Sequence, residues 1–392
     1  MATLIGDSKS AVQPSEEQQV VLDEQIGHIR VVTLNSPRKL NIISSKVVSR
    51  LAELFEKWED EKEAEIIIIK GTGRAFSAGG DLKMFYEGKA DESWIEVVYR
   101  MYWLLYHLHT YKKTLVAIVH GLAMGGGASF AVPSTFSVVT ENTVFATPEA
   151  GFGFHTDCSF SYVLSHLPGH LGEYLALTGA RFDGAEMVAT GLATHYVPSK
   201  KLPELEKRLV SLSSGEREAV KASIEEFSIQ VKPGEKSILN NIPLIDKCFS
   251  KDTVEEIIES LVAESNTEGN EWVKETIKTL KRSSPSGLKI TLQSIRRGRK
   301  QILFECLKKE FRLTINTLRG LISNDMYEGI RAIMIEKDNS PKWNPLSLSE
   351  ITEEKLELVF NPFKDEFELQ LPEEGKIARW EGKYENSSYQ KK

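Results

Sequence analysis

Two acidic residues, Glu149 and Asp157, lie eight residues apart in a glycine-containing segment and are the first candidates for chemistry. Beside a polarised carbonyl group, such a pair can supply a nucleophile or general base and a partner acid, provided that burial moves their pKa values apart. The spacing equally describes a solvated pair on a surface loop, and by spacing alone that interpretation is favoured. The catalytic interpretation therefore requires a second feature that polarises a carbonyl group.

Two glycine-rich turns, residues 77–80 and 124–127, offer that feature. Glycine has no Cβ atom, so the backbone can approach a ligand closely. The first N–H groups of a helix that follows such a turn are unpaired, and they favour a phosphate or a developing oxyanion. If the two turns face each other, each aims one N–H at the same carbonyl oxygen, which creates an oxyanion hole. The triple glycine by itself also fits a simple packing turn.

The turns must be positioned by the apolar runs that precede them, at residues 65–70 and 114–119, which have the length of strands. The first run is apolar on both faces, which predicts a strand buried on both sides. Further strands are predicted at residues 20–22, 28–34, 136–140, 143–146 and 194–197. Helices are predicted at residues 94–109 and after Ser45, which we expect to be the N-cap.

From residue 202 onward the apolar spacing is helical almost throughout. The predicted helices span residues 216–227, 254–263, 271–281, 287–297, 301–321 and 353–359. This change of secondary structure divides the chain into a polar, disordered tail (1–17), an α/β core (18–200), an all-helical region (201–345) and a short helix with a polar tail (346–392).

The composition is that of an ordinary globular protein, with 392 residues, 41% hydrophobic and 27% charged. A net charge of −7 argues against nucleic-acid binding. Three cysteines without a CxxC pair favour a reducing compartment and no disulfides. Because no membrane-spanning run, secretory signal, transit peptide or SKL-type address is visible, we expect an intracellular protein, cytosolic by elimination.

Other chemistries are less favoured by the sequence. His155 and Asp157 lack further ligands at a plausible spacing, so no metal site is predicted. Cys158 is expected to be an inert thiol, because the neighbouring carboxylate raises its pKa. No GxSxG, GxGxxG or GxxxxGK[ST] motif occurs. The basic cluster at residues 296–300 is interpreted as a solvated helix end, with nucleic acid or the phosphates of a small ligand as less favoured partners.

Several blocks of the sequence resemble the crotonase (enoyl-CoA hydratase/isomerase) superfamily. The three blocks that resemble its signatures are residues 67–81, 120–127 and 145–149. Three others, residues 175–181, 191–195 and 327–343, resemble the 3-hydroxyisobutyryl-CoA hydrolase branch, and most closely its plant-type members. The resemblance covers roughly residues 18 to 350.

The resemblance implies a crotonase-like spiral of ββα units, followed by the all-helical region, that holds an acyl-CoA thioester carbonyl between two backbone N–H groups. By position these N–H groups belong to Ala78 and Gly126. Glu149 matches the catalytic glutamate of the family, and Asp157 matches the aspartate that marks the hydrolases. CoA is part of the substrate, so no separate cofactor is expected. The remaining residues expected to contact the substrate or CoA are Arg74, Gly79, Gly80, Asp81, Gly125 and Gly127.

Ser129 stands where hydratases carry their second glutamate, which favours hydrolysis over water addition. The resemblance therefore implies a hydrolase of short 3-hydroxyacyl-CoA, with 3-hydroxyisobutyryl-CoA of valine breakdown as the expected substrate. A catalytically weak scaffold or binding subunit, and a hydratase or isomerase, are the alternatives. The expected partner is a small-molecule acyl-CoA, with neither nucleic acid nor membrane, and self-association stays open. Members of the family are mitochondrial or peroxisomal.

The sequence departs from the hydrolase pattern around Asp157. Hydrolases usually carry proline before this aspartate and small residues, often glycines, after it, whereas this chain has Thr156 before it and Cys158, Ser159 and Phe160 after it. The added bulk of Thr156, Ser159 and Phe160 is expected to reshape or narrow the acyl pocket. Met101 also occupies the position of a substrate-contacting glutamate in animal members, so recognition of a substrate hydroxyl does not carry over. The altered loop motivates the scaffold alternative.

Overall fold

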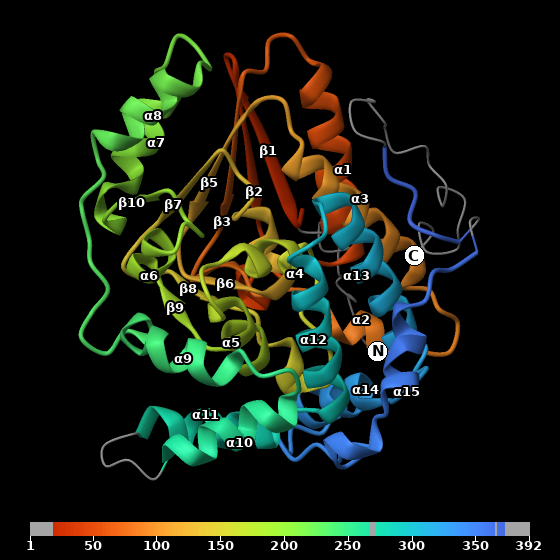
Figure 1. Ribbon diagram of the computed structural model, residues 1–392. Helices are drawn as coiled ribbons and strands as arrows, with labels where there is room; N and C mark the ends of the chain where they lie inside the picture. Colours follow the sequence, from red (N-terminus) through yellow and green to blue (C-terminus); the bar gives the residue numbers. More distant parts are fainter. Residues whose placement is uncertain (1–18, 266–270, 365–366, 373–392) are drawn as a thin grey trace, which may run out of the picture.

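The computed structural model describes residues 19–265, 271–364 and 367–372, and the predicted disordered tail at residues 1–17 lies outside these residues. Within the described residues the strands form two sheets (Figure 1). The larger sheet has the order β1 (Val21–Ile26), β2 (Ile29–Leu34), β3 (Ile66–Gly71), β5 (Thr114–Val119), β7 (Phe136–Val139) and β10 (His195–Tyr196). The smaller has the order β4 (Ala75–Ser77), β6 (Leu122–Met124), β8 (Val144–Ala146) and β9 (Phe182–Asp183).

The connectivity repeats the same unit along the chain. In the larger sheet β1 is antiparallel to β2, and the other neighbouring strands are parallel. Each of β3, β5 and β7 is followed by one strand of the smaller sheet, β4, β6 or β8, and these three run parallel to one another. The chain therefore winds between the two sheets, which is the predicted spiral of ββα units and places both glycine-rich turns at the ends of neighbouring strands.

Helices cover both faces of the larger sheet. On one face α1 (Ser45–Asp60) and α3 (Ile95–His109) pack against β3 and β5. On the other face α7 (Leu202–Val210) and α8 (Arg217–Glu225) pack against the alternate residues of the same strands. This double coverage explains why β5 is buried at every position and apolar at every position after Thr114. The N-cap of α1 is Ser44 and not the predicted Ser45, since its hydroxyl accepts from the N–H of Val47.

The predicted helical character of the region after residue 202 is confirmed. Its longer helices are α9 (Ile242–Phe249), α10 (Val254–Ser265), α11 (Glu271–Arg282), α12 (Pro285–Gly298), α13 (Leu303–Leu318) and α15 (Glu353–Phe360). A short helix, α14 (Asp325–Ile330), also lies in this region. The remaining α-helices of the described chain come before residue 200 and are α2 (Leu82–Glu87), α4 (Phe160–Val163), α5 (Leu171–Thr178) and α6 (Gly184–Ala189). The sequence pattern missed α9, and it ended β1 too early, because the turn that follows β1 lies at Gly27 (φ +57°).

The helical region shares its hydrophobic core with the α/β part of the chain. Helix α12 packs against α4 and α5, and α13 packs against α3 and α4 (Figure 1). Leu164 and Phe311, from the two sides of the predicted boundary at residue 200, belong to one cluster of buried residues. The boundary is therefore a change of secondary structure without a break in the core.

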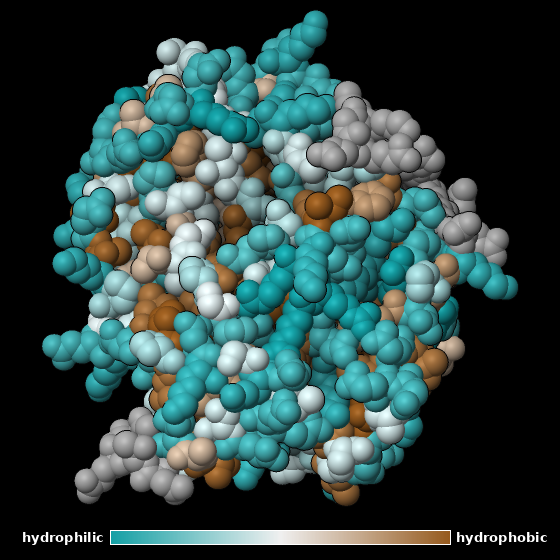
Figure 2. Space-filling view, viewed as in Figure 1, coloured by the Kyte–Doolittle hydropathy of each residue, from teal (hydrophilic) through white to brown (hydrophobic). Residues whose placement is uncertain are grey.

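The distribution of polar residues on the surface is consistent with a core that holds most of the apolar residues. Figure 2 shows a mostly hydrophilic face, on which apolar residues appear singly or in small groups. Among the described helices, none is both long enough and apolar enough to cross a membrane.

Candidate active site

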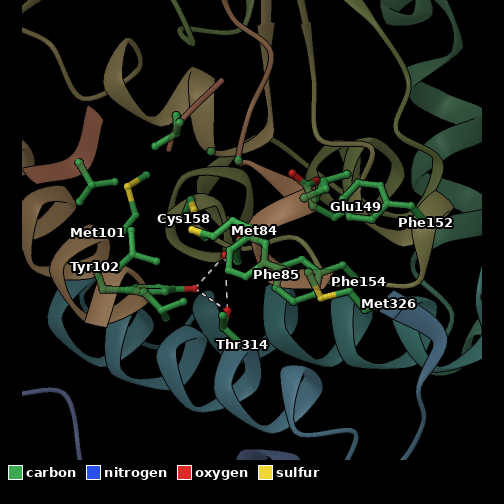
Figure 3. Close-up of a pocket in the computed structure, with 18 residues that line it drawn as sticks. Met84, Phe85, Met101, Tyr102, Glu149, Phe152, Phe154, Cys158, Thr314 and Met326 are labelled. Atoms are coloured by element: carbon green, nitrogen blue, oxygen red, sulfur yellow. Dashed lines mark hydrogen bonds between the residues drawn. The ribbon is translucent and has the colours of Figure 1, made fainter. Parts of the chain in front are cut away.

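The two glycine-rich turns, the segment after β8, and helices α1, α2, α3, α13 and α14 enclose a cavity of about 80 Å³. A single water molecule needs roughly 10–15 Å³ on this measure, so a small acyl group can be accommodated. Figure 3 shows Met101 and Tyr102 at one end, Glu149 and Phe152 at the other, and Met84, Phe85 and Cys158 between them. The wall is mainly apolar, and its polar side chains are those of Tyr102, Glu149, Asp157, Cys158 and Thr314.

The structure requires a correction to the predicted oxyanion hole. The N–H of Ala78 donates to the carbonyl of Leu40 at 2.9 Å, and Ala78 does not line the cavity. A backbone donor that is already paired with another carbonyl is not available to a substrate oxygen. Ala78 is therefore replaced as the candidate donor by a neighbouring residue.

That neighbour is Gly80, which lines the cavity together with Gly126. The N–H of Ile43 donates to the carbonyl of Gly79, and the carbonyl of Ile43 accepts from the N–H of Asp81. Because successive residues of an extended segment alternate in direction, the N–H of Gly80 faces away from Ile43. Gly126 lies in the first turn of the 3₁₀-helix η2 (Gly125–Phe130), where N–H groups lack partners within the helix. Gly80 and Gly126 are thus the pair of candidate donors.

Glu149 begins the 3₁₀-helix η3 (Glu149–Phe152) and places its carboxyl group in the cavity wall (Figure 3). The side chain is only 5% exposed, and Oε2 has no hydrogen-bond partner within the described residues. Burial, followed by the charge of Asp157, raises the pKa of Glu149 well above its usual value. Gly125 admits this carboxyl group, since a Cβ atom there would lie 2.2 Å from Oε1.

Asp157 is held by a hydroxyl pair that the sequence analysis did not identify. The hydroxyl of Tyr102 donates to Oδ2 at 3.0 Å, and the hydroxyl of Thr314 lies 2.8 Å from that of Tyr102 and 3.4 Å from Oδ2. Figure 3 shows these contacts as dashed lines. Burial raises the pKa of Asp157 to about 6, and the hydrogen bond from Tyr102 limits that rise. Asp157 can therefore change its proton occupancy near neutral pH.

The segment after Asp157 adopts a conformation that residues with side chains rarely take. Cys158 (φ +57°) and Ser159 (φ +73°) both have left-handed backbones, for which glycine is the natural residue. The buried carboxylate of Glu310, from α13, accepts from the N–H of Ser159 and from the N–H of Ser161, both at 2.7 Å. Glu310 was also missed by the sequence analysis.

The expected narrowing of the pocket by Phe160 is not observed. Phe160 is 1% exposed, packs against Phe145 with a ring separation of 5.6 Å, and does not line the cavity. The bulk near Gly126 comes instead from Cys158 and Met101, whose Sγ and Cε atoms lie 3.1 and 3.8 Å from where a Cβ of Gly126 would stand. At the positions where this chain departs from the family pattern, the sulfur-containing side chains of Cys158 and Met101 thus form this part of the cavity wall.

Of four other predicted contact residues, three have structural roles in the turns. The side chain of Asp81 caps α2 by accepting from the N–H three residues later. Gly79 (φ +99°) makes the turn, and Gly127 packs so closely against Ser77 that a Cβ atom would lie 2.6 Å from its carbonyl oxygen. Arg74 is exposed and does not line the cavity. Their contact with CoA stays a prediction.

The structure also shows the surroundings of the other two candidates, His155 and the basic cluster at residues 296–300. Burial lowers the pKa of His155 to about 4, so its ring is neutral, and it lies 3.4 Å from the hydroxyl of Thr314. No group of three or more metal-binding side chains occurs in the described ranges. The interpretation of residues 296–300 as a solvated helix end is confirmed in part, because α12 ends at Gly298 and both Arg299 and Lys300 are exposed. The arginines are nevertheless bonded, since Arg299 pairs with the buried Glu173 at 2.7 Å and Arg296 and Arg297 also have partners.

Comparison with known proteins agrees with this architecture. The model of the Enoyl-CoA hydratase/isomerase family matches residues 29–360. Among solved structures, the chain is similar to a carnitinyl-CoA dehydratase from Mycobacterium thermoresistibile, with a TM-score of 0.82, 33% identity, and coverage of 92% of this chain and 100% of that one.

Three relatives from Arabidopsis thaliana align over nearly the whole chain. The "3-hydroxyisobutyryl-CoA hydrolase-like protein 5" is 61% identical over 95% of this chain and 97% of its own length. The "3-hydroxyisobutyryl-CoA hydrolase 1" is 41% identical over 92% and 96%. The "small ribosomal subunit protein mS47" is also 41% identical, over 93% and 90%. With its spiral of ββα units and its paired glycine turns, this chain belongs to the crotonase (enoyl-CoA hydratase/isomerase) superfamily, in the 3-hydroxyisobutyryl-CoA hydrolase-like branch.

Proposed function

We propose that this protein hydrolyses short acyl-CoA thioesters, and that its substrate is 3-hydroxyisobutyryl-CoA, which yields 3-hydroxyisobutyrate and CoA in valine catabolism. The observation that carries the proposal is the carboxyl group of Glu149, whose Oε2 atom is buried without a hydrogen-bond partner in the described part of the chain, beside the turn that contains Gly126. An unpaired buried carboxyl group costs stability, so its position favours a role toward a substrate. The relatives named as hydrolases give independent support.

In the proposed mechanism the thioester carbonyl oxygen accepts hydrogen bonds from the N–H groups of Gly80 and Gly126. Each such donor typically contributes about 3 kcal/mol to the stability of the oxyanion, because a fixed backbone needs no reorganisation. The ionised form of Glu149 then attacks the carbonyl carbon and expels the CoA thiolate, which leaves a mixed anhydride that water hydrolyses. Alternatively, Glu149 takes a proton from water that attacks directly. Asp157 supplies the proton that the CoA sulfur receives.

The two routes can be separated by a single turnover in water labelled with heavy oxygen. The anhydride route places label in the carboxyl group of Glu149 when water attacks that side, whereas direct attack never does. Mass spectrometry of the peptide that contains Glu149 measures the difference.

The primary test is a thioesterase assay across short acyl-CoA substrates with Glu149→Gln and wild-type protein. We expect kcat to fall by about 100-fold or more in the variant, because Gln can neither attack nor accept a proton. Glu63→Gln, at an exposed glutamate that does not line the cavity, is the matched control. Wild-type turnover no faster than that of Glu149→Gln would contradict the proposal.

A second candidate function is that of a non-catalytic assembly subunit. It is favoured by the similarity to mS47, which is named as a ribosomal subunit protein, and by the altered residues that follow Asp157. Failure of the thioesterase assay, together with retention of the fold, would favour this alternative. The assay thus discriminates between the two.

A hydratase or isomerase is the less favoured alternative. The hydroxyl of Ser129, at the position of the second hydratase glutamate, donates to the carbonyl of Gly126 at 2.6 Å. A hydroxyl engaged in this way does not replace the missing carboxylate as an acid or base. Crotonyl-CoA should accordingly be hydrated no faster by wild-type protein than by Glu149→Gln.

A further inference from the structure

The backbone after Asp157 needs an external support. Cys158 and Ser159 are consecutive residues with positive φ, and a Cβ atom makes that conformation sterically unfavourable. Asp157 precedes them, so relaxation of these residues toward ordinary φ values would turn its side chain away from the cavity. Something outside the segment must hold it.

Glu310 of α13 provides the direct hold. It is fully buried, and its two carboxylate oxygens accept separately from the N–H groups of Ser159 and Ser161. Hydrogen bonds to an ionised acceptor in a buried site are among the stronger ones in proteins. The two N–H groups flank Phe160, so the carboxylate spans the point where the left-handed residues pass into α4.

The same face of α13 also holds the side chain of Asp157. Thr314 lies four residues after Glu310, one turn along the helix, and its hydroxyl lies 3.4 Å from the Asp157 carboxylate. Glu310 therefore fixes the backbone and Thr314 contacts the side chain. The position of the acidic group relative to the cavity depends on this one helix.

We propose that Glu310 is a positioning residue that keeps residues 157–161 in the left-handed conformation and thereby aims Asp157 at the acyl group of the substrate. The catalytic part of this inference rests on the proposed hydrolase function. The mechanical part, that the carboxylate holds the loop, does not depend on it.

The surrounding charges are consistent with this role. The charged groups that act on Glu310 include Asp157, from the held segment, Lys309, from the same helix, and Glu149, from η3, and Ser161 bonds to it. Mainly because of burial, its pKa is raised to about 7. The ionised carboxylate of Glu310 accepts hydrogen bonds from both N–H groups through its two equivalent oxygens, whereas protonation turns one of these oxygens into a donor.

The test compares Glu310→Gln with Glu305→Gln, an exposed glutamate of the same helix that does not contact the loop. The amide side chain in Glu310→Gln keeps one oxygen that can accept a hydrogen bond. Its NH₂ group is a donor and faces the other backbone N–H, which is also a donor, so that hydrogen bond is lost. We expect amide hydrogen exchange of the peptide spanning residues 157–163 to accelerate about tenfold in Glu310→Gln only. We also expect kcat to fall by up to about 100-fold with KM changed less than about threefold, since a displaced catalytic group slows chemistry more than binding.

A second variant separates positioning from general destabilisation. Glycine adopts positive φ without a steric penalty, so Ser159→Gly in the Glu310→Gln background should restore slow exchange and recover kcat about tenfold. Because Ser159 Oγ is buried without a partner, the change removes no hydrogen bond of that hydroxyl. The double variant also permits measurement if Glu310→Gln alone does not fold.

Two results would overturn the inference. One is wild-type exchange in the 157–163 peptide of Glu310→Gln, and the other is a double variant with no recovery. If wild-type protein shows no thioesterase activity, the hydrolase proposal fails, but the exchange measurements still decide whether Glu310 holds the loop.

Discussion

Two opposing influences, burial and hydrogen bonding, set the ionisation of Asp157. Burial raises its pKa, and the hydrogen bonds donated by Tyr102 and Thr314 stabilise the charged form and lower it again. Within the described residues Glu149 has no comparable donor at Oε2, and burial raises its pKa well above its usual value. Two carboxyl groups in one cavity thus have their ionisation set by different neighbours.

Removal of the Tyr102 hydroxyl should therefore change the pH profile in a defined direction. In Tyr102→Phe the carboxylate loses a donor, so the pKa of Asp157 rises above about 6. We expect the limb of the kcat/KM profile that depends on protonated Asp157, the proposed proton donor, to shift to higher pH, by up to about one unit. Thr314→Val should shift it in the same direction. A shift to lower pH in steady-state assays would contradict this assignment.

The raised pKa of Glu310 also predicts a pH dependence of stability. Between its usual value of 4.5 and its folded value of about 7, the folded state binds more protons than the unfolded state. The contribution of Glu310 to the free energy of unfolding therefore falls as the pH rises through this window, by at most about 1.4 kcal/mol per pH unit. Urea unfolding of wild-type protein and Glu310→Gln at pH 5 to 7.5 measures it. A constant difference between the two across that range would contradict the prediction.

At the scale of elements, the site depends on how closely η2 and η3 approach each other. Gly125 has φ +46° and touches the Glu149 carboxyl group, so these two short helices are in contact through one missing side chain. This contact, rather than a ligand, explains the first of the three glycines. The second glycine offers the candidate N–H donor, and the third allows η2 to pack on β4.

Gly125→Ala should therefore displace Glu149 and strain the turn. A Cβ atom would stand 2.2 Å from Oε1, so the carboxyl group must move, and we expect kcat to fall at least about tenfold. Stability should fall by about 1 kcal/mol or more, because alanine resists positive φ. Gly151→Ala is the control, since a Cβ atom there meets nothing within 4 Å. Equal effects of the two changes on kcat would be inconsistent with this explanation.

The elements themselves were largely predictable, whereas the contacts between them were not. Strand and helix positions follow from local periodicity, which is why β3, β5 and most of the longer helices after residue 202 were identified. The choice of Gly80 over Ala78 depends on the pairing of Ile43 with an extended segment, and the sequence around the turn carries no signal of that pairing. A shift of this pairing by one residue would change which N–H faces the cavity.

The supporting residues of the site were unpredictable for a related reason. Tyr102 and Thr314 lie 55 and 157 residues from Asp157 along the chain. The available hint was that Glu310 and Thr314 are polar residues four apart on a helix face that also carries Leu307, Phe311 and Leu318, which marks an unusual buried face. Such a pattern indicates that a partner exists without telling which segment supplies it.

For the whole molecule, the continuity of the core makes the helical region part of the site. Helix α13 contributes Glu310 and Thr314, and it packs on α3 and α4. The fold after residue 200 is thus required for the geometry around Asp157, although its residues show no catalytic motif.

We therefore expect the chain to unfold in one cooperative transition. Trp58 and Trp103 report on the part before residue 200, and Trp272 reports on the helical region, so single-tryptophan variants can follow each part in urea. The midpoints should coincide with each other and with far-ultraviolet circular dichroism. Two separate transitions would show that the regions are independent.

The outer strand of the larger sheet has a consequence for behaviour in concentrated solution. Within the described residues β1 pairs only with β2, and Asp23, Glu24 and Gln25 are exposed along it. Negative charge on such an edge repels the edge of another copy and so opposes fibril growth by strand addition. Replacement of Asp23 and Glu24 by threonine or valine would remove this protection against aggregation, and neither residue lines the cavity that holds Glu149.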